Sequence, residues 1–195
     1  MKIKISPSLL LLLASSVLSE HPELTFIAFS AAAIHESGHI LAAKILRIKI
    51  KSIRLSILGA SIETNFIDLS YKNEAILCIC GPLSNIVSAF TMYFCFGATN
   101  QNILFFITVS LILAFLNLLP VKGFDGGRIL FALIQHFSTI NILNKVLEIS
   151  SFICIFTLWS ISVYFILKTG AYLSLFIFSG SLFAKMFLIE EKNNI

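Results

Sequence analysis

Long apolar segments follow one another along almost the whole chain, with only short polar links between them. A helix needs about 20 mostly apolar residues to cross the hydrocarbon core of a bilayer. Six stretches approach that length, near Ile5–Leu18, Leu24–Leu46, Ala75–Phe96, Ile103–Leu119, Val146–Leu167 and Ala171–Ile189. Only 12% of the 195 residues are charged, whereas a soluble domain has about 25%. The sequence therefore predicts a mainly α-helical membrane protein with about six transmembrane helices, in one membrane domain over residues 1–195.

The first segment, Ile5–Leu18, is short, contains Pro7 and has two interpretations. Lys2 and Lys4 ahead of an apolar run are also typical of a signal peptide. The small-residue cleavage pattern is weak, with Val17-Leu18-Ser19 as its nearest match. We therefore expect the segment to be retained as a helix.

The basic residues are distributed very unevenly over the links between the segments. With both termini in the cytoplasm, 13 of the 14 Lys and Arg residues lie on the cytoplasmic side, and only Lys168 lies outside. Cytoplasmic links are enriched in Lys and Arg, so this orientation is the expected one. The net charge of +4, without a basic patch, gives no indication of nucleic-acid binding.

The stretch Ile48–Phe66, between the second and third segments, has a different pattern. Its apolar residues alternate on both sides of Gly59, which predicts a β-hairpin. Open strand edges are not tolerated against lipid, so a membrane-associated hairpin should lie at the interface or face a cavity. An ordinary basic loop is the alternative.

The second segment contains the sequence His35-Glu36-Ser37-Gly38-His39. Residues four apart share one helix face, so both imidazoles can bind one metal ion, with Glu36 beside them as a base. Small residues such as Gly38 and Ala42 let neighbouring helices approach closely. An acidic side chain near the bilayer centre costs roughly 2.5–3.5 kcal/mol, which argues against ionisable groups without a role. A buried hydrogen-bonded cluster without metal is the alternative.

A catalytic zinc commonly has three protein ligands, and Asp125 is the candidate for the third. It follows the fourth segment, where Pro120, Gly123 and Gly126-Gly127 break the helix and permit a re-entrant turn. The charge rule places the end of this segment and His35–His39 at similar depth on the cytoplasmic side. The rival ligands are Glu74, Glu148 and His136.

The third segment contains Gly81-Pro82-Leu83-Ser84-Asn85. A Gly-Pro pair inside a span bends or opens the helix. Asn85 then has two interpretations. It can make a helix–helix hydrogen bond at a packing kink, or it can donate to the substrate backbone or to a developing oxyanion.

Taken in this order, the motifs resemble the site-2 protease family of intramembrane zinc metalloproteases, peptidase family M50. The matching residues are His35-Glu36-x-x-His39, Gly81-Pro82-x-x-Asn85 and Asn117-x-x-Pro120 leading to Asp125-Gly126. The six-span length and the basic stretch around Gly59 are most similar to the stage IV sporulation subgroup. Gly123 and Phe124 replace the proline and leucine that the family often has before the aspartate. We expect neither a PDZ nor a CBS domain.

The resemblance implies a multi-pass protein of the cell membrane that cleaves membrane-tethered regulatory proteins, such as a sporulation or transcription-factor precursor. Carried over residue by residue, His35, His39 and Asp125 bind Zn²⁺. Glu36 is then the catalytic base, and Asn85 binds the substrate. The active site would face the cytoplasmic side, and a regulatory membrane partner is a further expectation.

Three other classes of protein compete with this interpretation. A catalytically inactive, membrane-embedded metal-binding protein would be expected to lose Glu36 or a ligand, and the sequence keeps them all. A metal transporter would need polar residues along several spans, whereas the last two segments carry little beyond scattered Ser and Thr. A structural membrane subunit would make the set of motifs a coincidence.

Overall fold

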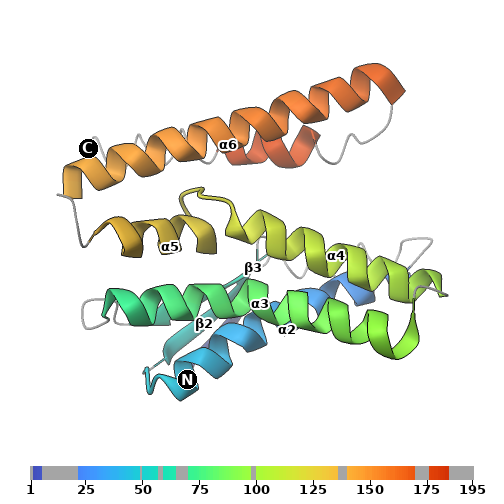
Figure 1. Cartoon of the computed structure of the whole chain (residues 1–195), viewed down its shortest axis with the longest axis horizontal. Helices are drawn as coiled ribbons and strands as arrows, with labels where there is room; N and C mark the ends of the chain where they lie inside the picture. Colours follow the sequence, from blue (N-terminus) through green and yellow to red (C-terminus); the bar gives the residue numbers. More distant parts are fainter. Residues whose placement is uncertain are drawn as a thin grey trace. The chain divides into compact units, whose positions relative to one another are not determined.

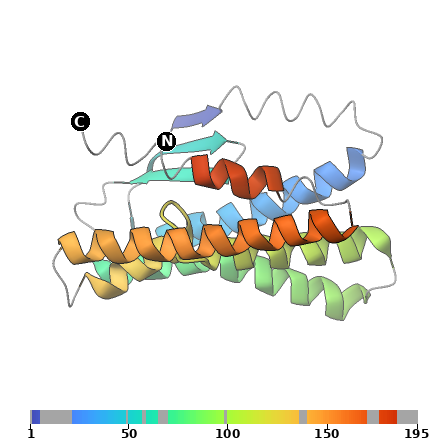
Figure 2. The ribbon, with the colours of Figure 1, turned by 90° about the horizontal axis from the view of Figure 1, so that it is seen from above.

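A computed structural model describes residues 2–5, 22–48, 50–56, 59–64, 70–97, 100–135, 140–169 and 176–184. This part of the chain is mainly helical, with one small sheet (Figures 1 and 2). It divides into two compact units, Met1–Leu118 and Leu119–Ile195. The prediction of one membrane domain over residues 1–195 stays a prediction.

Four helices are long and apolar enough to cross a membrane. They are α2 (Pro22–Ile45), α3 (Tyr71–Phe96), α4 (Gln101–Leu118) and Asn141–Lys168 within α6 (Ile140–Thr169). They correspond to the second, third, fourth and fifth predicted segments. Most of the first predicted segment lies outside the described residues, and of the sixth only 176–184 is described, as helix. The number of six spans therefore stays a prediction.

The exposed and buried faces of α3 have the composition expected in lipid. Large apolar side chains point outward: Val87, Phe90 and Phe94 are 56%, 54% and 79% exposed. The buried face instead carries small or polar residues, namely Cys78, Gly81, Asn85 and Ala89, together with Leu77 and Pro82. Small interior residues that let helices approach closely are typical of transmembrane packing. The outward apolar side chains are compatible with contact to lipid.

The first unit is built around α3, which packs against both α2 and α4, while α2 also contacts α4 (Figure 1). The contact between α2 and α3 is close because Gly38 has no side chain. A methyl group there would overlap the Cys80 carbonyl oxygen and the Ser84 hydroxyl. Ala42, Ala43 and Leu77 form a small core beside it. The prediction that small residues around the histidines bring a neighbouring helix near is confirmed.

Pro82 lies inside α3 without ending it, since the helix runs continuously from Tyr71 to Phe96. Of the two predicted effects of Gly81-Pro82, a bend or an opening of the helix, the opening is not found, and the bend stays a prediction. A proline removes one backbone hydrogen bond, and neighbouring helices help a membrane helix tolerate that loss. The helix ends at Gly97, whose φ of 68° requires glycine.

The sheet has three strands, β1 (Lys2–Ile5), β2 (Ile50–Ser56) and β3 (Gly59–Thr64), in the order β1-β2-β3. Strands β2 and β3 pair antiparallel, from Ser56 opposite Gly59 to Ile50 opposite Thr64. This is the pairing predicted for the hairpin over Ile48–Phe66. The parallel strand β1, which places Lys2 opposite Ser52, was not predicted, because a four-residue alternation was treated as the flank of an apolar run.

The second unit consists of a short loop, α5 (Asp125–Ile134), α6 and the helical residues 176–184. Helix α5 contacts α6. The core of the unit is formed by Val121, Ile155 and Leu182, which are almost fully buried. Val121 belongs to the loop, so the loop that leads to Asp125 is anchored in this core.

Two hydroxyl groups of α6 hold the loop from Leu119 to Phe124. The Ser150 hydroxyl donates to the Pro120 carbonyl oxygen at 2.8 Å, and the Lys122 amide donates to the Ser151 hydroxyl at 2.8 Å. Gly123 has a φ of 99°, which favours glycine. The helix break at Pro120 is confirmed, since α4 ends at Leu118.

Asp125-Gly126-Gly127 was interpreted as part of that turn, and this interpretation is wrong. Asp125 is the first residue of α5, and both glycines are buried in its first turn. Gly127 is needed there because a Cβ would overlap the Val121 carbonyl group. The two glycines therefore serve the close contact between a helix start and the preceding loop, which overrides the low helix propensity of glycine.

Candidate metal centre

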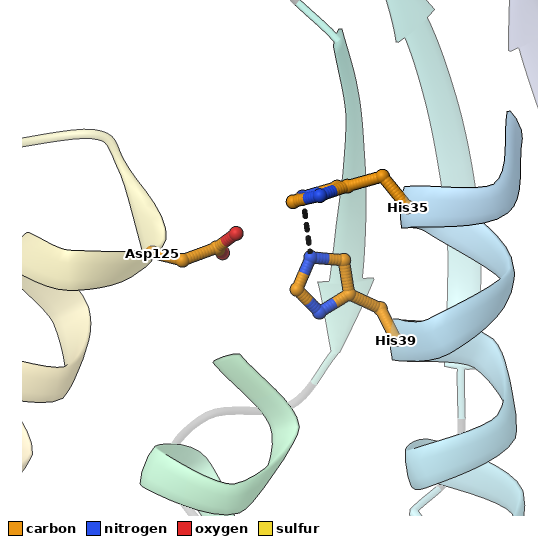
Figure 3. A group of neighbouring side chains, drawn as sticks. All are labelled: His35, His39 and Asp125. Atoms are coloured by element: carbon orange, nitrogen blue, oxygen red, sulfur yellow. Dashed lines mark hydrogen bonds between the residues drawn. The ribbon is translucent and has the colours of Figure 1, made fainter. Parts of the chain in front are cut away.

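His35 and His39 lie one turn apart on α2 and are both buried, with exposures of 6% and 7%. Figure 3 shows the two rings extending from the same side of the helix, with their Nε2 atoms facing each other. The Nε2 atoms are 3.1 Å apart, and the rings meet edge to face with centroids 4.8 Å apart. The predicted pairing of the two imidazoles on one helix face is confirmed.

A backbone carbonyl on α3 fixes the orientation of His39. The Nδ1–H group of His39 donates to the Leu77 carbonyl oxygen at 2.8 Å. Because a carbonyl oxygen can only accept, Nδ1 carries the ring hydrogen, and Nε2 of neutral His39 keeps its lone pair. Metal-binding histidines usually have such a partner on the second ring nitrogen. His39 is therefore preset to bind a metal through Nε2.

The spacing of the two nitrogens fits a zinc ion. Nitrogen ligands about 2.05 Å from a tetrahedral zinc lie roughly 3.3 Å from each other. The observed Nε2–Nε2 separation of 3.1 Å is close to that distance. Small adjustments of the two side chains are enough to bring both lone pairs onto one ion.

Gly81 keeps the space beside these nitrogens open. A Cβ at this position would overlap Nε2 of His39 and lie 2.8 Å from Nε2 of His35. The backbone of α3 thus approaches the two ring nitrogens as closely as a residue without a side chain allows. This role for Gly81 was not predicted. The sequence does contain a pattern that indicates it, since Leu77, Gly81 and Asn85 are spaced four residues apart and therefore share one face of α3.

Glu36 follows His35 directly and is half-buried. Its Oε2 atom is shielded from solvent. A residue next to one ligand and three before the other lies beside both on the helix surface. Glu36 is therefore placed near the histidine pair, within a helix of membrane-spanning length.

Asn85 is fully buried on α3, with 0% exposure. Its side-chain Nδ2 lies 3.4 Å from Nδ1 of His35. The structure thus brings Asn85 to one of the two histidines, in the helix–helix contact that was one of its two interpretations.

Asp125 belongs to the second unit, where it begins α5 and is half-buried (Figure 3). No side chain caps this helix start, which follows Phe124. A carboxylate in the first turn is favoured by the positive end of the helix dipole. The rival ligands Glu74 and Glu148 are half-buried on α3 and α6, and His136 lies outside the described residues.

A buried histidine pair with a neighbouring glutamate, on a helix long and apolar enough to cross a membrane, is the candidate metal site of a membrane protein. Comparison with known proteins makes the class specific. The model of peptidase family M50 matches residues 97–161. Stage IV sporulation protein FB of Bacillus subtilis (strain 168) is 28% identical over 137 residues, which is 68% of this chain and 48% of that protein. The chain thus spans about half the length of this curated relative.

A solved structure extends the likeness to the fold. The Site-2 Protease from Methanocaldococcus jannaschii matches with a TM-score of 0.62 and 22% identity, over 94% of this chain and 88% of that chain. The comparisons agree with the predicted resemblance: the chain is similar to peptidase family M50 over residues 97–161, to the sporulation protein in sequence, and to the site-2 protease in fold.

Proposed function

We propose that this chain is an intramembrane zinc metalloprotease that hydrolyses peptide bonds of membrane-tethered regulatory proteins. One observation carries the proposal. Two buried histidines present Nε2 atoms 3.1 Å apart, beside a glutamate, on a helix long and apolar enough to cross a membrane. That arrangement provides two metal ligands and a base in the same helical turn.

Asp125 supplies the third ligand in this proposal. With His35 and His39 it gives two imidazole nitrogens and one carboxylate oxygen, each residue offering one ligand atom. Three protein ligands of this kind leave a fourth position open, as catalytic zinc sites require. The loop from Leu119 to Phe124, bound to Ser150 and Ser151, fixes where α5 begins and so where Asp125 is presented.

In this proposal, residues of the chain have separate roles in peptide-bond hydrolysis. His35, His39 and Asp125 would hold the zinc, which would supply Lewis-acid chemistry by lowering the pKa of water to about 7 and polarising the substrate carbonyl. Glu36 accepts the proton of the attacking water and passes it to the leaving amine, so the C–N bond breaks without a charged amide leaving group.

The substrate class and the orientation follow from the same features. A site inside a membrane-length helix is accessible to a substrate that is itself held in the membrane, which supports a tethered protein. The distribution of Lys and Arg supports a site towards the cytoplasmic side. The pairing of β1 with β2 supports it too, because Lys2–Ile5 then lies beside the strand that follows α2. In the proposal, the sheet lies at the membrane interface on this side, and a regulatory membrane partner is also expected there.

The proposal is tested with the Glu36→Gln variant. The full chain is co-expressed with a panel of tethered transcription-factor precursors, and the zinc content is measured on purified protein in detergent. We expect the variant to keep zinc and to lose cleavage by roughly 10²–10⁴-fold, the usual contribution of general acid–base catalysis. Ser37→Ala is the matched control, since the Ser37 hydroxyl is exposed and bonds only within its own helix turn, to Ile34. Cleavage by Glu36→Gln at the rate of Ser37→Ala would refute the mechanism.

A further inference from the structure

Asn85 makes a contact that substrate binding does not require. Its amide lies against Nδ1 of His35, and the side chain has 0% exposure. The other amide atom, Oδ1, is also buried and has no hydrogen-bond partner among the described residues. A buried carbonyl oxygen without a partner is unfavourable. The amide therefore has one end on a metal ligand and an unused acceptor.

The hydrogen bonds around the two histidines form a chain with one consistent direction. His39 donates through Nδ1 to Leu77, so its Nε2 is an acceptor. The bond between the two Nε2 atoms then needs a hydrogen on Nε2 of His35. Nδ1 of neutral His35 is in turn an acceptor, and Nδ2 of Asn85 donates to it. Each neutral imidazole carries one hydrogen, and these three hydrogen bonds use one hydrogen on each ring.

Zinc ligation through both Nε2 atoms requires the other tautomer of His35. The lone pair of each Nε2 then goes to the metal, and the ring hydrogen of His35 moves to Nδ1. That nitrogen becomes a donor and faces the NH₂ group of Asn85, which is also a donor. A half-turn of the amide replaces NH₂ by the oxygen, which has nearly the same size.

We propose that Asn85 is a positioning residue whose Oδ1 accepts the Nδ1–H of His35 and so selects the zinc-binding tautomer. The inference rests on the proposed zinc site and deepens it. An amide suits this position because it can donate to one tautomer and accept from the other. The Leu77 carbonyl oxygen, which can only accept, selects the corresponding tautomer of His39. Both metal ligands are then oriented by the same face of α3.

The test measures zinc affinity of the full chain in detergent, by competition with a chelator of known affinity. Asn85→Leu keeps the number of side-chain heavy atoms and the branch at Cγ but removes the acceptor, and should weaken zinc binding by about 10–100-fold, the usual effect of losing an outer-shell partner. Asn85→Asp keeps an acceptor and should bind zinc within a few-fold of wild type. Thr91→Val is the matched control on α3, because its hydroxyl bonds only to Val87 of the same helix.

A second readout follows the tautomer directly. In protein with ¹⁵N-labelled histidine and added zinc, wild type and Asn85→Asp should show a protonated Nδ1 on His35. Asn85→Leu should show either loss of this signal or a mixture of tautomers. If Asn85→Leu does not fold, the comparison of Asn85→Asp with wild type still decides, because a donor role for Asn85 predicts that aspartate weakens zinc binding.

The outcomes separate this inference from the proposed function. Zinc bound equally by wild type, Asn85→Leu and Asn85→Asp, with a raised KM for the tethered substrate, would overturn the positioning role in favour of substrate contact. Absence of zinc from the wild-type protein would overturn both proposals. Zinc in the wild type with the expected order of the variants supports both.

Discussion

The hydroxyl of Ser84 on α3 lies 2.9 Å from the carbonyl oxygen of Ile34 on α2, the residue that precedes His35. It also lies 2.7 Å from the Gly81 carbonyl oxygen in its own helix. The hydroxyl therefore joins the two helices at the level of the candidate metal centre. It does so beside Gly38, where a Cβ would overlap the Ser84 hydroxyl.

Replacing this hydroxyl should weaken the helix pair without removing a metal ligand. Ser84→Ala is expected to lower the free energy of unfolding by about 0.6 kcal/mol, the average measured by double-mutant cycles for interhelical hydrogen bonds in a membrane protein. Zinc stoichiometry should be unchanged. Unfolding in detergent measures the first quantity and metal analysis the second. Thr157→Val is the control, since its hydroxyl is exposed and bonds only within α6; an equal effect of both changes would contradict the interhelical role.

Gly81→Ala should abolish zinc binding. The added methyl group would overlap Nε2 of His39 and crowd Nε2 of His35, so the rings must turn away from the metal position. Gly180→Ala is the matched control, because nothing lies within 4 Å of a Cβ at that helical position. Metal analysis after purification is the measurement, with gel filtration to show that each variant is monodisperse. A Gly81→Ala protein with the zinc content of Gly180→Ala would show that the space beside the rings is not used.

Asp125→Asn should weaken zinc binding rather than catalysis alone. The change exchanges an anionic ligand for a neutral amide of the same shape, and we expect at least about a tenfold loss of affinity, because even the loss of an outer-shell partner costs about 10–100-fold. Chelator competition in detergent gives the value. Glu74→Gln and Glu148→Gln remove the rival carboxylates and should leave the affinity unchanged. Loss of zinc in either control, with Asp125→Asn unaffected, would transfer the ligand role.

The orientation in the membrane is tested by labelling single cysteines in a background without Cys78, Cys80, Cys95 and Cys154. A membrane-impermeant maleimide added to intact cells should label Glu23→Cys, at the start of α2, but not Lys122→Cys. Both parent side chains are exposed, so both should react after the cells are permeabilised. Labelling of Lys122→Cys alone in intact cells would place the candidate site on the outer side.

The strongest parts of the prediction are those that depend on a repeating pattern. Continuous apolar runs predicted α2, α3, α4 and α6, because a bilayer demands length and apolar composition alone. The spacing of His35 and His39 predicted a shared helix face for the same geometrical reason. The alternation around Gly59 predicted the pairing of β2 with β3.

The weaker parts depend on contacts between distant residues. Helix α5 begins with Asp125-Gly126-Gly127, which local propensity assigns to a turn, and only the approach of Val121 to Gly127 explains it. The carbonyl of Leu77 carries no sequence signal as a hydrogen-bond acceptor, since every residue has one. Strand β1 depends on a partner 50 positions away, Lys2 opposite Ser52, and four residues are too few for alternation to identify a strand.

The parallel pairing of β1 with β2 also has a consequence for folding during translation. Lys2–Ile5 leaves the ribosome first, but its partner in β2 follows 50 residues later, a delay of roughly 3–10 s at ordinary rates of translation. During that interval the residues of α2 are synthesised, since they lie between the two strands in the sequence. The sheet can therefore form only after the segment that carries both histidines has been synthesised, and the residues of β3 follow those of β2.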